Sequence, residues 1–220
     1  MIGVVTGFKA EAALLPAGVR VLCSGGRALL ARQRAEELLA EGAGGLLSFG
    51  VAGGLVDGWG PGGLVVAGGV VLASGEVLCC APWWTAALLD GLPDALGGLV
   101  VAGSEVVATT AAKQGLRQRS GALAVDLESG AVAEVCRAAG KPFAVLRAIA
   151  DPVERGIPPI ALAALNEAGG LRLGAVLCGL ALRPWALGSL LRLGLDSRAG
   201  LRALAVAAER LGATLGFETM

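Results

Sequence analysis

One stretch constrains the fold of this chain more than any other, and it runs from Ala122 to Asp151 (ALAVDLESGAVAEVCRAAGKPFAVLRAIAD). In it an apolar run, an amphipathic segment and a second apolar run follow one another. The pattern predicts a strand, a helix and a strand, over Ala122–Val125, from the capping residue Ser129 to about Ala139, and over Phe143–Ile149. Because a βαβ unit crosses over with right-handed topology, we expect the two strands to be parallel and their carboxyl ends to share one edge of a sheet.

Acidic side chains stand at the carboxyl ends of three predicted strands. Glu128 follows the first strand of this unit and Asp151 ends the second, while Glu11 follows an N-terminal strand over Ile2–Thr6. Open α/β sheets bind their ligands at this edge, so the three carboxyls are candidates for one site. For Glu11 alone, an acid in the first turn of a helix is the simpler interpretation, because the helix dipole favours negative charge there.

The composition of the 220-residue chain is that of one unusually apolar domain with a full core. The chain is 55% hydrophobic and 16% charged, with a mean hydropathy of +0.72. Its longest uncharged run, Gly58–Gly75, contains Pro61 and many glycines, so it predicts turns and a strand and not a membrane span. Zero net charge gives no basic surface for nucleic acid, and no basic leader precedes the first strand, so no signal peptide is expected.

Histidine is absent from the sequence, which excludes Ser-His-Asp and Cys-His catalysis and most zinc sites. The five cysteines lack metal-ligand spacing and predict buried thiols in a reducing compartment. We therefore expect no metal and no cofactor, and acid–base chemistry that rests on carboxylates. The expected location is the cytoplasm, with the inner membrane surface as the alternative.

Apolar runs and turn residues predict the remaining elements. Further strands are expected over Val19–Cys23, Gly45–Phe49, Leu64–Ala73, Glu76–Cys80 and Leu99–Val107. A helix is expected after the Val19–Cys23 strand, up to about Glu41. Further helices are expected over Trp83–Leu89, Thr109–Arg119, Ile160–Asn166, Leu171–Leu182, Ala186–Leu193 and Leu201–Leu211. The first of these helices has an apolar stripe made of Leu29, Leu30, Leu38 and Leu39. Strands that alternate with helices indicate the α/β class.

Two glycine-rich segments follow predicted strands. Ser24–Arg27 (SGGR) opens a helix, and its free N–H groups offer an anion site, although a simple tight turn explains the segment equally well. Gly50–Leu55 places bare backbone at the end of a strand, where a ligand can approach it. Neither segment has the spacing of a nucleotide-binding loop.

The C-terminal part of the chain is rich in leucine. Residues Leu182–Leu195 combine leucines and Trp185 with Arg183 and Arg192, a mixture that suits a helix on a membrane surface. Packing as an outer helix, or against a second subunit, is the alternative interpretation.

Three segments resemble the nucleoside phosphorylase and nucleosidase superfamily, which includes the methylthioadenosine/adenosylhomocysteine nucleosidases. They are GVVTGFKAEAALL near the N-terminus, SFGVAGGL in the middle, and AVDLESGAVAEVCRAAGKPFAVLRAIAD. The resemblance implies one nucleoside phosphorylase-like α/β domain over residues 1–220, with a central mixed, twisted sheet, partly barrel-like and flanked by helices. Residues 181–220 would form a C-terminal helical extension, and the protein would be a homodimer or a higher homo-oligomer.

Carried over residue by residue, the resemblance implies a role for each acid. Asp151 would bind N7 of the purine and donate the proton that makes adenine a good leaving group, and Glu11 would activate water. Glu128 would bind the ribose 2′- and 3′-hydroxyls, with Leu127 beneath the sugar. An oxocarbenium-like transition state needs such a division, with an acid on the leaving side and a nucleophile on the opposite face. Asp151 must then hold a proton near neutral pH, which requires a desolvated site.

The predicted base pocket departs from the family at three positions. Val51 and Ala150 stand where nucleosidases have serines, and Val106 stands where they have an adenine-stacking phenylalanine. Base recognition is therefore expected to be looser or differently built.

The acceptor of the ribosyl group, either water or phosphate as a co-substrate, stays open at this point. The candidate phosphate or water site consists of Gly25, Gly26, Arg27 and Gly53. Arg27 favours phosphate, because a guanidinium binds it bidentately. Glu11 favours water, and Ser48 stands where hexameric phosphorylases have a phosphate-binding arginine.

The closing RPWALGSLLRLGLDSRAGLRAL, with VDLES and ADPVERGIPP, is similar to the bacterial hopanoid-associated branch of this superfamily. This resemblance implies an enzyme that releases adenine from adenosylhopane. The segment between Glu11 and Ser24 is shorter than in the family, which suits an adenine nucleoside with a hydrophobic 5′ tail. The alternatives are a salvage phosphorylase or methylthioadenosine-type nucleosidase for soluble nucleosides, and a non-catalytic module for an apolar ligand or a membrane surface.

Overall fold

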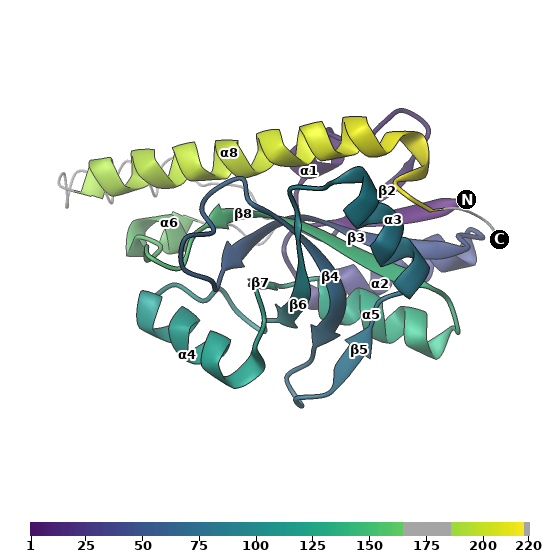
Figure 1. Cartoon of the computed structure of the whole chain (residues 1–220), viewed down its shortest axis with the longest axis horizontal. Helices are drawn as coiled ribbons and strands as arrows, with labels where there is room; N and C mark the ends of the chain where they lie inside the picture. Colours follow the sequence, from purple (N-terminus) through teal and green to yellow (C-terminus); the bar gives the residue numbers. More distant parts are fainter. Residues whose placement is uncertain (165–185, 218–220) are drawn as a thin grey trace.

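One mixed β-sheet organises the protein, and the computed structural model describes residues 1–164 and 186–217. The strands of the sheet within these residues are β1 (Ile2–Thr6), β2 (Arg20–Cys23), β3 (Gly45–Gly54), β4 (Leu64–Val71), β5 (Val77–Cys79), β6 (Leu96–Ala102), β7 (Ala124–Asp126) and β8 (Phe143–Asp151). Hydrogen bonding follows the order β2–β1–β3–β7–β6–β4–β5, and β8 joins β3 to β4. Strands β3, β7, β6, β4 and β8 therefore form a closed ring, the partly barrel-like sheet that the resemblance implies (Figure 1).

The two strands of the predicted βαβ unit, β7 and β8, are not neighbours in this sheet. Strand β7 is parallel to β6 but antiparallel to the end of β3, where Gly53 lies opposite Val125. Strand β8 is parallel to β3 and antiparallel to β4. The prediction of a parallel pair is wrong, because β3 shifts register between Ala52 and Gly53 and its last residues reach β7 as the ring closes. The last residues of both strands, Asp126 and Asp151, nevertheless line one cavity.

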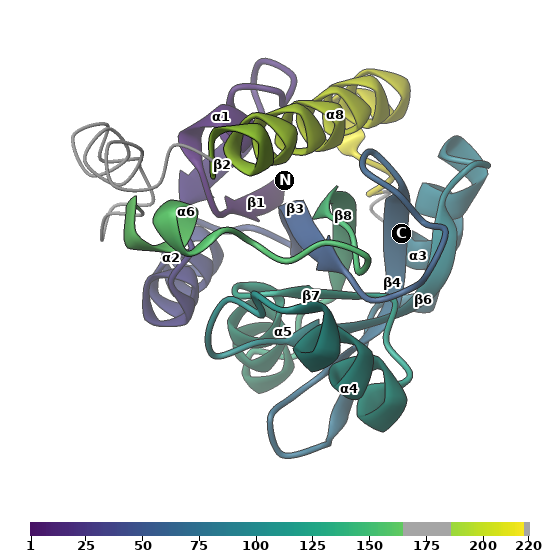
Figure 2. The same cartoon turned by 90° about the vertical axis from the view of Figure 1, so that its left-hand side faces the viewer.

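Helices lie on both sides of the sheet. They are α1 (Lys9–Ala12), α2 (Ala28–Ala40), α3 (Pro82–Gly91), α4 (Thr110–Ser120), α5 (Ser129–Ala138), α6 (Pro159–Ala164) and α8 (Leu187–Leu211), followed by the 3-10 turn η2 (Gly212–Thr214). Helices α2 and α5 contact each other, and α8 packs along β8 and β3. In Figure 2, α8 lies above these strands and α5 lies below β7. No helix in the described ranges combines the length and the apolar character that crossing a bilayer requires.

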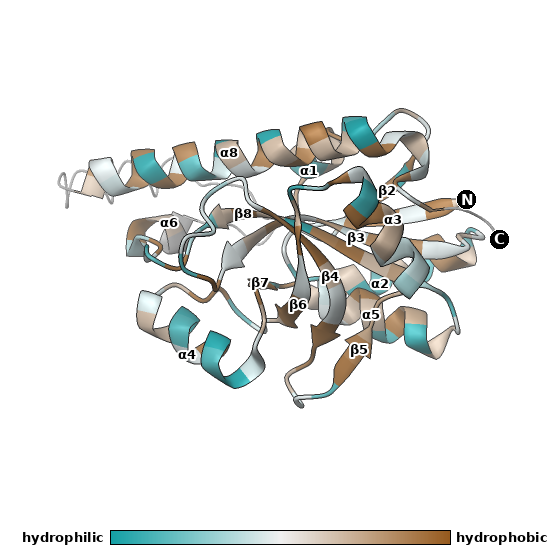
Figure 3. Cartoon of the chain, viewed as in Figure 1, coloured by the Kyte–Doolittle hydropathy of each residue, from teal (hydrophilic) through white to brown (hydrophobic). Residues whose placement is uncertain are grey.

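The core has two main parts, one on each side of the sheet, and Figure 3 shows how hydrophobic residues concentrate in the strands. Leu46 packs with the cluster beneath α2 and α5, while its neighbour Leu47 packs with the cluster beneath α3 and α8. This alternation follows from the two-residue period of a strand. In the second cluster the indole N–H of buried Trp84 donates a hydrogen bond of 2.9 Å to the Leu215 carbonyl, which fastens the chain after α8.

Two predictions about helices and strands need correction. Helix α2 buries Ala31, Ala35 and Leu38, whereas Leu29 is 70% exposed, so the predicted leucine stripe is only partly the buried one. Strand β3 continues through Gly54, whereas the sequence predicted a strand over Gly45–Phe49. The reason is that its backbone pairs with β8 as far as Gly53 and with β7 at Gly53 and Gly54.

Helix α8 is one continuous helix of 25 residues, where the sequence predicted two. Its buried residues, which include Leu204, Ala207 and Ala208, pack on the sheet, and this packing outweighs the low helix propensity of the glycines in its middle. The predicted helix Leu171–Leu182 lies outside the described residues.

Gly200 brings α8 unusually close to the sheet. A methyl group added at Gly200 would lie 3.2 Å from the Ile149 carbonyl oxygen and 3.3 Å from both Ala150 Cβ and Val51 Cγ1. The absence of a side chain at this position therefore sets the distance between α8 and the ends of β3 and β8.

The cysteines of the described residues are free thiols in different surroundings. Cys80 and Cys136 are buried, Cys23 is half-buried, and Cys79 is exposed. The prediction of a buried thiol is wrong for Cys79, because this residue ends the short strand β5 at the margin of the sheet.

Candidate active site

A cavity of about 580 Å³ lies at the ends of β3, β7 and β8, between the sheet and the first half of α8. The three acids singled out from the sequence, Glu11, Glu128 and Asp151, all line it. Of the other predicted site residues, the cavity is lined by Gly26, Val51, Gly53, Val106, Leu127 and Ala150. Sequence positions far apart are therefore brought to one place.

Two predicted residues, Gly25 and Arg27, do not line this cavity. Gly25 and Gly26 have positive φ angles of 66° and 72°, so the chain turns sharply here. Arg27 is the N-cap residue that precedes α2, and its side chain is exposed. The glycine turn touches the cavity through Gly26 alone.

Glu11 belongs to the first turn of α1, and it also lies on the cavity, so both interpretations of this residue apply. Its Oε2 accepts a hydrogen bond of 2.8 Å from the Phe8 N–H, which caps the helix. Its Oε1 accepts another of 2.8 Å from the Val51 N–H of β3. The side chain is therefore held at both oxygens, and burial raises the pKa of this carboxyl although these N–H groups and Arg147 lower it.

Glu128 lies next to Glu11 at the start of α5. A methyl group added at Gly7 would stand 2.9 Å from Glu128 Oε1 and 3.3 Å from Glu11 Oε2, so the two carboxyls flank one glycine. Burial raises the pKa of Glu128 to about 8, Arg147 opposes this shift, and the nearby acids Asp126 and Glu11 add to it. Burial therefore favours the protonated form of Glu128.

A buried arginine that the sequence analysis missed stands behind these acids. Arg147, in the middle of β8, is completely buried, and its Nε forms an ion pair with Asp126. Its Nη2 donates hydrogen bonds of 2.6 Å to Ser48 Oγ and 3.0 Å to Ser129 Oγ, and lies 3.5 Å from Glu128 Oε2. A charged residue inside an apolar strand was the available signal, because such a residue is buried only when it is paired.

The start of α5 also differs from its prediction. Ser129 is the first residue of the helix and not its cap. Its N–H donates a hydrogen bond of 3.0 Å to Asp126 Oδ1, and its hydroxyl donates to Asp126 Oδ2. Asp126 thus performs the capping and is the second residue that the sequence analysis missed.

Asp151, the last residue of β8, faces a buried lysine. Lys113 of α4 is completely buried, and its Nζ lies 2.6 Å from Asp151 Oδ2. Burial raises the pKa of Asp151, whereas Lys113 lowers it. Nothing in the sequence distinguished Lys113 from the solvent-exposed residues of a polar helix.

The charges around the cavity are strongly one-sided. Within the described residues, five acids line it and no lysine or arginine does: the acids are Glu11, Glu105, Asp126, Glu128 and Asp151. Both buried cations, Lys113 and Arg147, lie behind the acids and do not reach the cavity surface. This arrangement suits a neutral or cationic ligand.

The opposite wall of the cavity is apolar and comes from α8. Leu190 and Leu193 line it together with Gly194 and Ser197. On another face of the same helix, Leu187, Leu191 and Leu195 are 49%, 61% and 65% exposed. Spacing of four residues places these three leucines on one side of the helix.

The comparisons with known proteins agree with this architecture. The family model described as the Phosphorylase superfamily matches residues 3–159. This chain belongs to the Phosphorylase superfamily. The superfamily, the α/β fold and an enzyme of the nucleoside phosphorylase and nucleosidase type, all expected from the sequence, are thereby confirmed. A comparison with curated proteins gives no match.

Several solved structures share the superfamily fold with this chain. S-adenosylhomocysteine nucleosidase from Streptococcus pyogenes, in complex with 5-methylthiotubericidin, is 17% identical, with a TM-score of 0.68 over 96% of this chain and 97% of that chain. The 5′-methylthioadenosine/S-adenosylhomocysteine nucleosidase from Colwellia psychrerythraea, in complex with adenine, is 17% identical, with a TM-score of 0.69 over 98% and 93%. Native futalosine hydrolase from Helicobacter pylori is 18% identical, with a TM-score of 0.66 over 94% and 97%.

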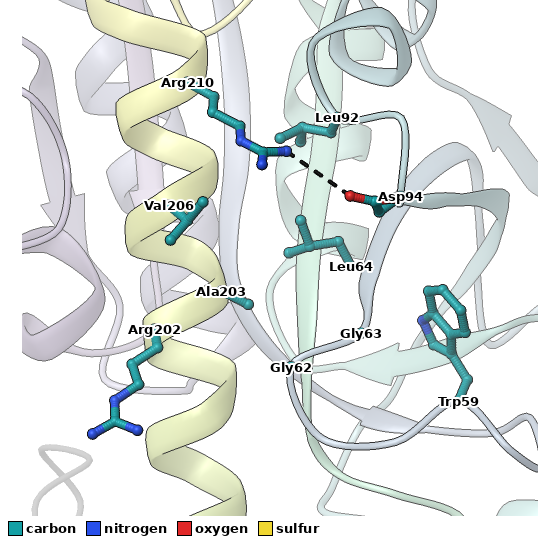
Figure 4. Close-up of a pocket in the computed structure, with 10 residues that line it drawn as sticks. All are labelled: Trp59, Gly62, Gly63, Leu64, Leu92, Asp94, Arg202, Ala203, Val206 and Arg210. Carbon is teal, nitrogen blue, oxygen red and sulfur yellow. Dashed lines mark ion pairs between the residues drawn. The ribbon is translucent and has the colours of Figure 1, made fainter.

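A second cavity, of about 430 Å³, lies along the other half of α8 (Figure 4). Arg210 of the helix reaches across it toward Asp94, whereas the Arg202 side chain points away from Asp94 and Trp59. Its lining contains a single carboxyl, Asp94, which Arg210 approaches to 4.0 Å. This cavity therefore lacks the pair of acids that glycosidic chemistry needs.

Proposed function

We propose that this protein cleaves the N-glycosidic bond of an adenine nucleoside by hydrolysis. The observation that carries this proposal is the convergence of Glu11, Glu128 and Asp151 on one cavity. A relative of the same fold was solved with adenine bound, which supports adenine as the base. The chemistry needs an acid for the leaving base and a general base for water, and no histidine is available to supply either.

Asp151 is proposed as the acid. Its raised pKa favours the protonated form, which can donate to N7 of the purine while the bond from C1′ to the base breaks. Val51, Val106 and Ala150, on the same cavity, would contact the base. Their apolar side chains keep water from the leaving group and strengthen the hydrogen bond that Asp151 makes.

Glu11 is proposed as the base that activates water. The N–H groups of Phe8 and Val51 fix both of its oxygens, so its orientation is set before the substrate binds. Burial favours the protonated form of Glu128, and in that form it can both donate to and accept from the ribose hydroxyls, with Leu127 beneath the sugar.

Water is favoured over phosphate as the acceptor by the charges of the cavity. Phosphate is an anion, and the described lining offers no lysine or arginine to bind it. Arg27, the sequence-based candidate for phosphate binding, is exposed and does not line the cavity.

We propose further that the substrate carries a hydrophobic 5′ substituent, with adenosylhopane as the specific candidate. The apolar wall formed by Leu190 and Leu193 supports this choice, because it offers a hydrocarbon chain a surface beside the acids. The exposed stripe of Leu187, Leu191 and Leu195 on the same helix suits a peripheral contact with the inner membrane surface, where such a substrate resides. Assembly into a homodimer or larger oligomer stays a prediction.

The test is adenine release from adenosylhopane and from methylthioadenosine, with and without phosphate. We expect release without phosphate and a higher kcat/KM for the tailed substrate. A requirement for phosphate would overturn hydrolysis, and equal rates for both substrates would favour a soluble salvage nucleosidase. Liposome binding with no adenine release from either substrate would instead identify a non-catalytic membrane-surface module.

A further inference from the structure

We propose that Lys113 is a positioning residue for the proton transfer: its buried ammonium group orients Asp151 and stabilises the carboxylate that Asp151 becomes after it donates its proton. This inference rests on the proposed function, because it concerns the acid of that reaction. It assigns a role to a residue from α4, an element that otherwise stands apart from the acids of the sheet.

Lys113 is enclosed by acceptors. Its Nζ donates hydrogen bonds to three carbonyl oxygens, those of Asp151 at 3.1 Å, Pro152 at 2.9 Å and Arg155 at 3.1 Å, and lies 2.6 Å from Asp151 Oδ2. The side chain is completely buried. A buried polar group needs partners, and here all of them are on the segment that carries the acid.

This cage selects the charged form of lysine. An ammonium group has three N–H donors, whereas a neutral amine has two, and four acceptors surround the nitrogen of Lys113. Burial lowers the pKa of Lys113, and Asp151 and Glu154 oppose this shift without reversing it. The three carbonyl dipoles therefore help to keep a cation behind Asp151.

The position of the cation determines which oxygen of Asp151 faces a ligand. Because the ammonium engages Oδ2, Oδ1 is the oxygen left for the base. The hydrogen bonds to the carbonyls of Asp151, Pro152 and Arg155 fix the backbone at Asp151 and in the turn that follows it. Lys113 thus holds Asp151 through both its backbone carbonyl and its side-chain carboxyl.

The charge matters at the moment of transfer. The O–H bond of Asp151 breaks, its proton joins N7 of the purine, and the electron pair of the broken C1′–N bond stays on the base. A carboxylate is left in a desolvated site, where an unpaired charge is costly. Lys113 pairs with this carboxylate, so it makes Asp151 a stronger acid than burial alone would allow.

The other charged groups around Asp151 do not replace Lys113. Asp196 of α8 raises the pKa of Asp151, and Asp196 is itself paired with Arg155. Glu154, next to Arg155 in the turn after β8, accepts a hydrogen bond of 2.9 Å from the Gly58 N–H. Lys113 is therefore the group that favours the ionised form of Asp151 through its side chain.

The test compares pH profiles of kcat for adenine release by the wild type, Lys113→Met and Lys113→Arg. Activity requires protonated Asp151, so it is lost as the pH rises through the pKa of this group. Removing the cation raises that pKa further. We expect Lys113→Met to lower the maximal kcat about 10- to 100-fold and to move the alkaline limb upward by about one pH unit. Lys113→Arg should keep the wild-type limb.

Lys141→Met is the matched control, because Lys141 is exposed and precedes β8, at the opposite end of that strand from Asp151. It should change neither kcat nor the limb. A Lys113→Met variant with lower kcat but an unshifted limb would show a merely structural role and overturn the inference. If Lys113→Met does not fold, Lys113→Gln, which keeps two N–H donors without the charge, must show the same upward shift. A wild type that releases no adenine would overturn the proposed function itself, so the two failures are distinguishable.

Discussion

The two walls of the cavity are built on opposite principles. The acidic wall is fixed by the sheet: Glu11, Glu128 and Asp151 are each tied by hydrogen bonds or ion pairs to the backbone or to a buried cation. The apolar wall is one face of α8, and Leu190 and Leu193 meet the cavity without polar partners. Directed interactions fix geometry, whereas apolar contacts are non-directional.

The difference indicates a division of tasks between the walls. Bond cleavage tolerates little displacement of the reacting groups, so rigid support belongs on the acidic side. An apolar wall discriminates between substituents by size and hydrophobicity and tolerates variation. We therefore expect substitutions on the acidic wall to change kcat or stability, and substitutions on α8 to change KM for particular substrates.

The largest expected effect concerns the acid. Asp151→Asn keeps the size of the side chain but cannot deliver a proton, so we expect kcat for adenine release to fall about 10²- to 10⁴-fold. Asp94→Asn, in the second cavity, should leave kcat unchanged and serves as the control (Figure 4). Equal activity of Asp151→Asn and the wild type would refute the assignment of the acid.

The second prediction concerns the support behind the acidic wall. Arg147→Met leaves Asp126 buried without its partner, so we expect the free energy of unfolding to fall by about 3–5 kcal/mol in a denaturant titration. Arg137→Met breaks the half-exposed pair with Glu76 and should cost less than about 1 kcal/mol. Similar losses in both variants would contradict the view that the acidic wall depends on a buried cation.

A third prediction uses the pH dependence of stability. Folded Glu128 keeps its proton up to about pH 8, whereas the unfolded chain loses it near 4.5. Over that window the folded state binds more protons, so its stability falls as the pH rises. Glu128→Gln removes this contribution and should reduce the decline between pH 5 and pH 8 by about 3–4 kcal/mol, measured by thermal unfolding. An equally steep decline in the variant would show that Glu128 is already ionised at neutral pH.

The smallest effect is expected on the apolar wall. Leu193→Ala should raise KM about 10-fold for a nucleoside with a long hydrophobic 5′ substituent and leave methylthioadenosine nearly unaffected, because only the former reaches α8. Leu195→Ala, on the exposed face, should leave both KM values unchanged in detergent solution. A rise for both substrates in Leu193→Ala would place the sugar or the base, and not the tail, against this wall.

The sequence predicted the parts of this protein that local pattern determines. The positions of Glu128 just after one strand and of Asp151 at the end of another follow from apolar runs bounded by acids and proline. The pairing of these strands could not be predicted from local pattern. Strand β7 pairs with β3 and β6, which are distant in the chain, and this pairing depends on the closure of the ring.

The supporting residues were harder to predict than the acids for the same reason. Arg147 and Lys113 are identified by what surrounds them in space, and their neighbours come from other elements. The division of α8 into two predicted helices failed because glycine propensity is a local quantity, whereas contacts of Leu204 with the sheet hold the helix together.

Gly200 does not line the cavity, yet it sets how closely α8 approaches the sheet beside it. At Gly200 the helix backbone packs against Ile149, Ala150 and Val51. Ala150 directly precedes Asp151, and both Ala150 and Val51 line the cavity. Any side chain at this point would act as a spacer and lift the leucine face from the acids. The width of the cavity therefore depends on a residue outside its lining, and we expect a larger side chain there to change substrate preference.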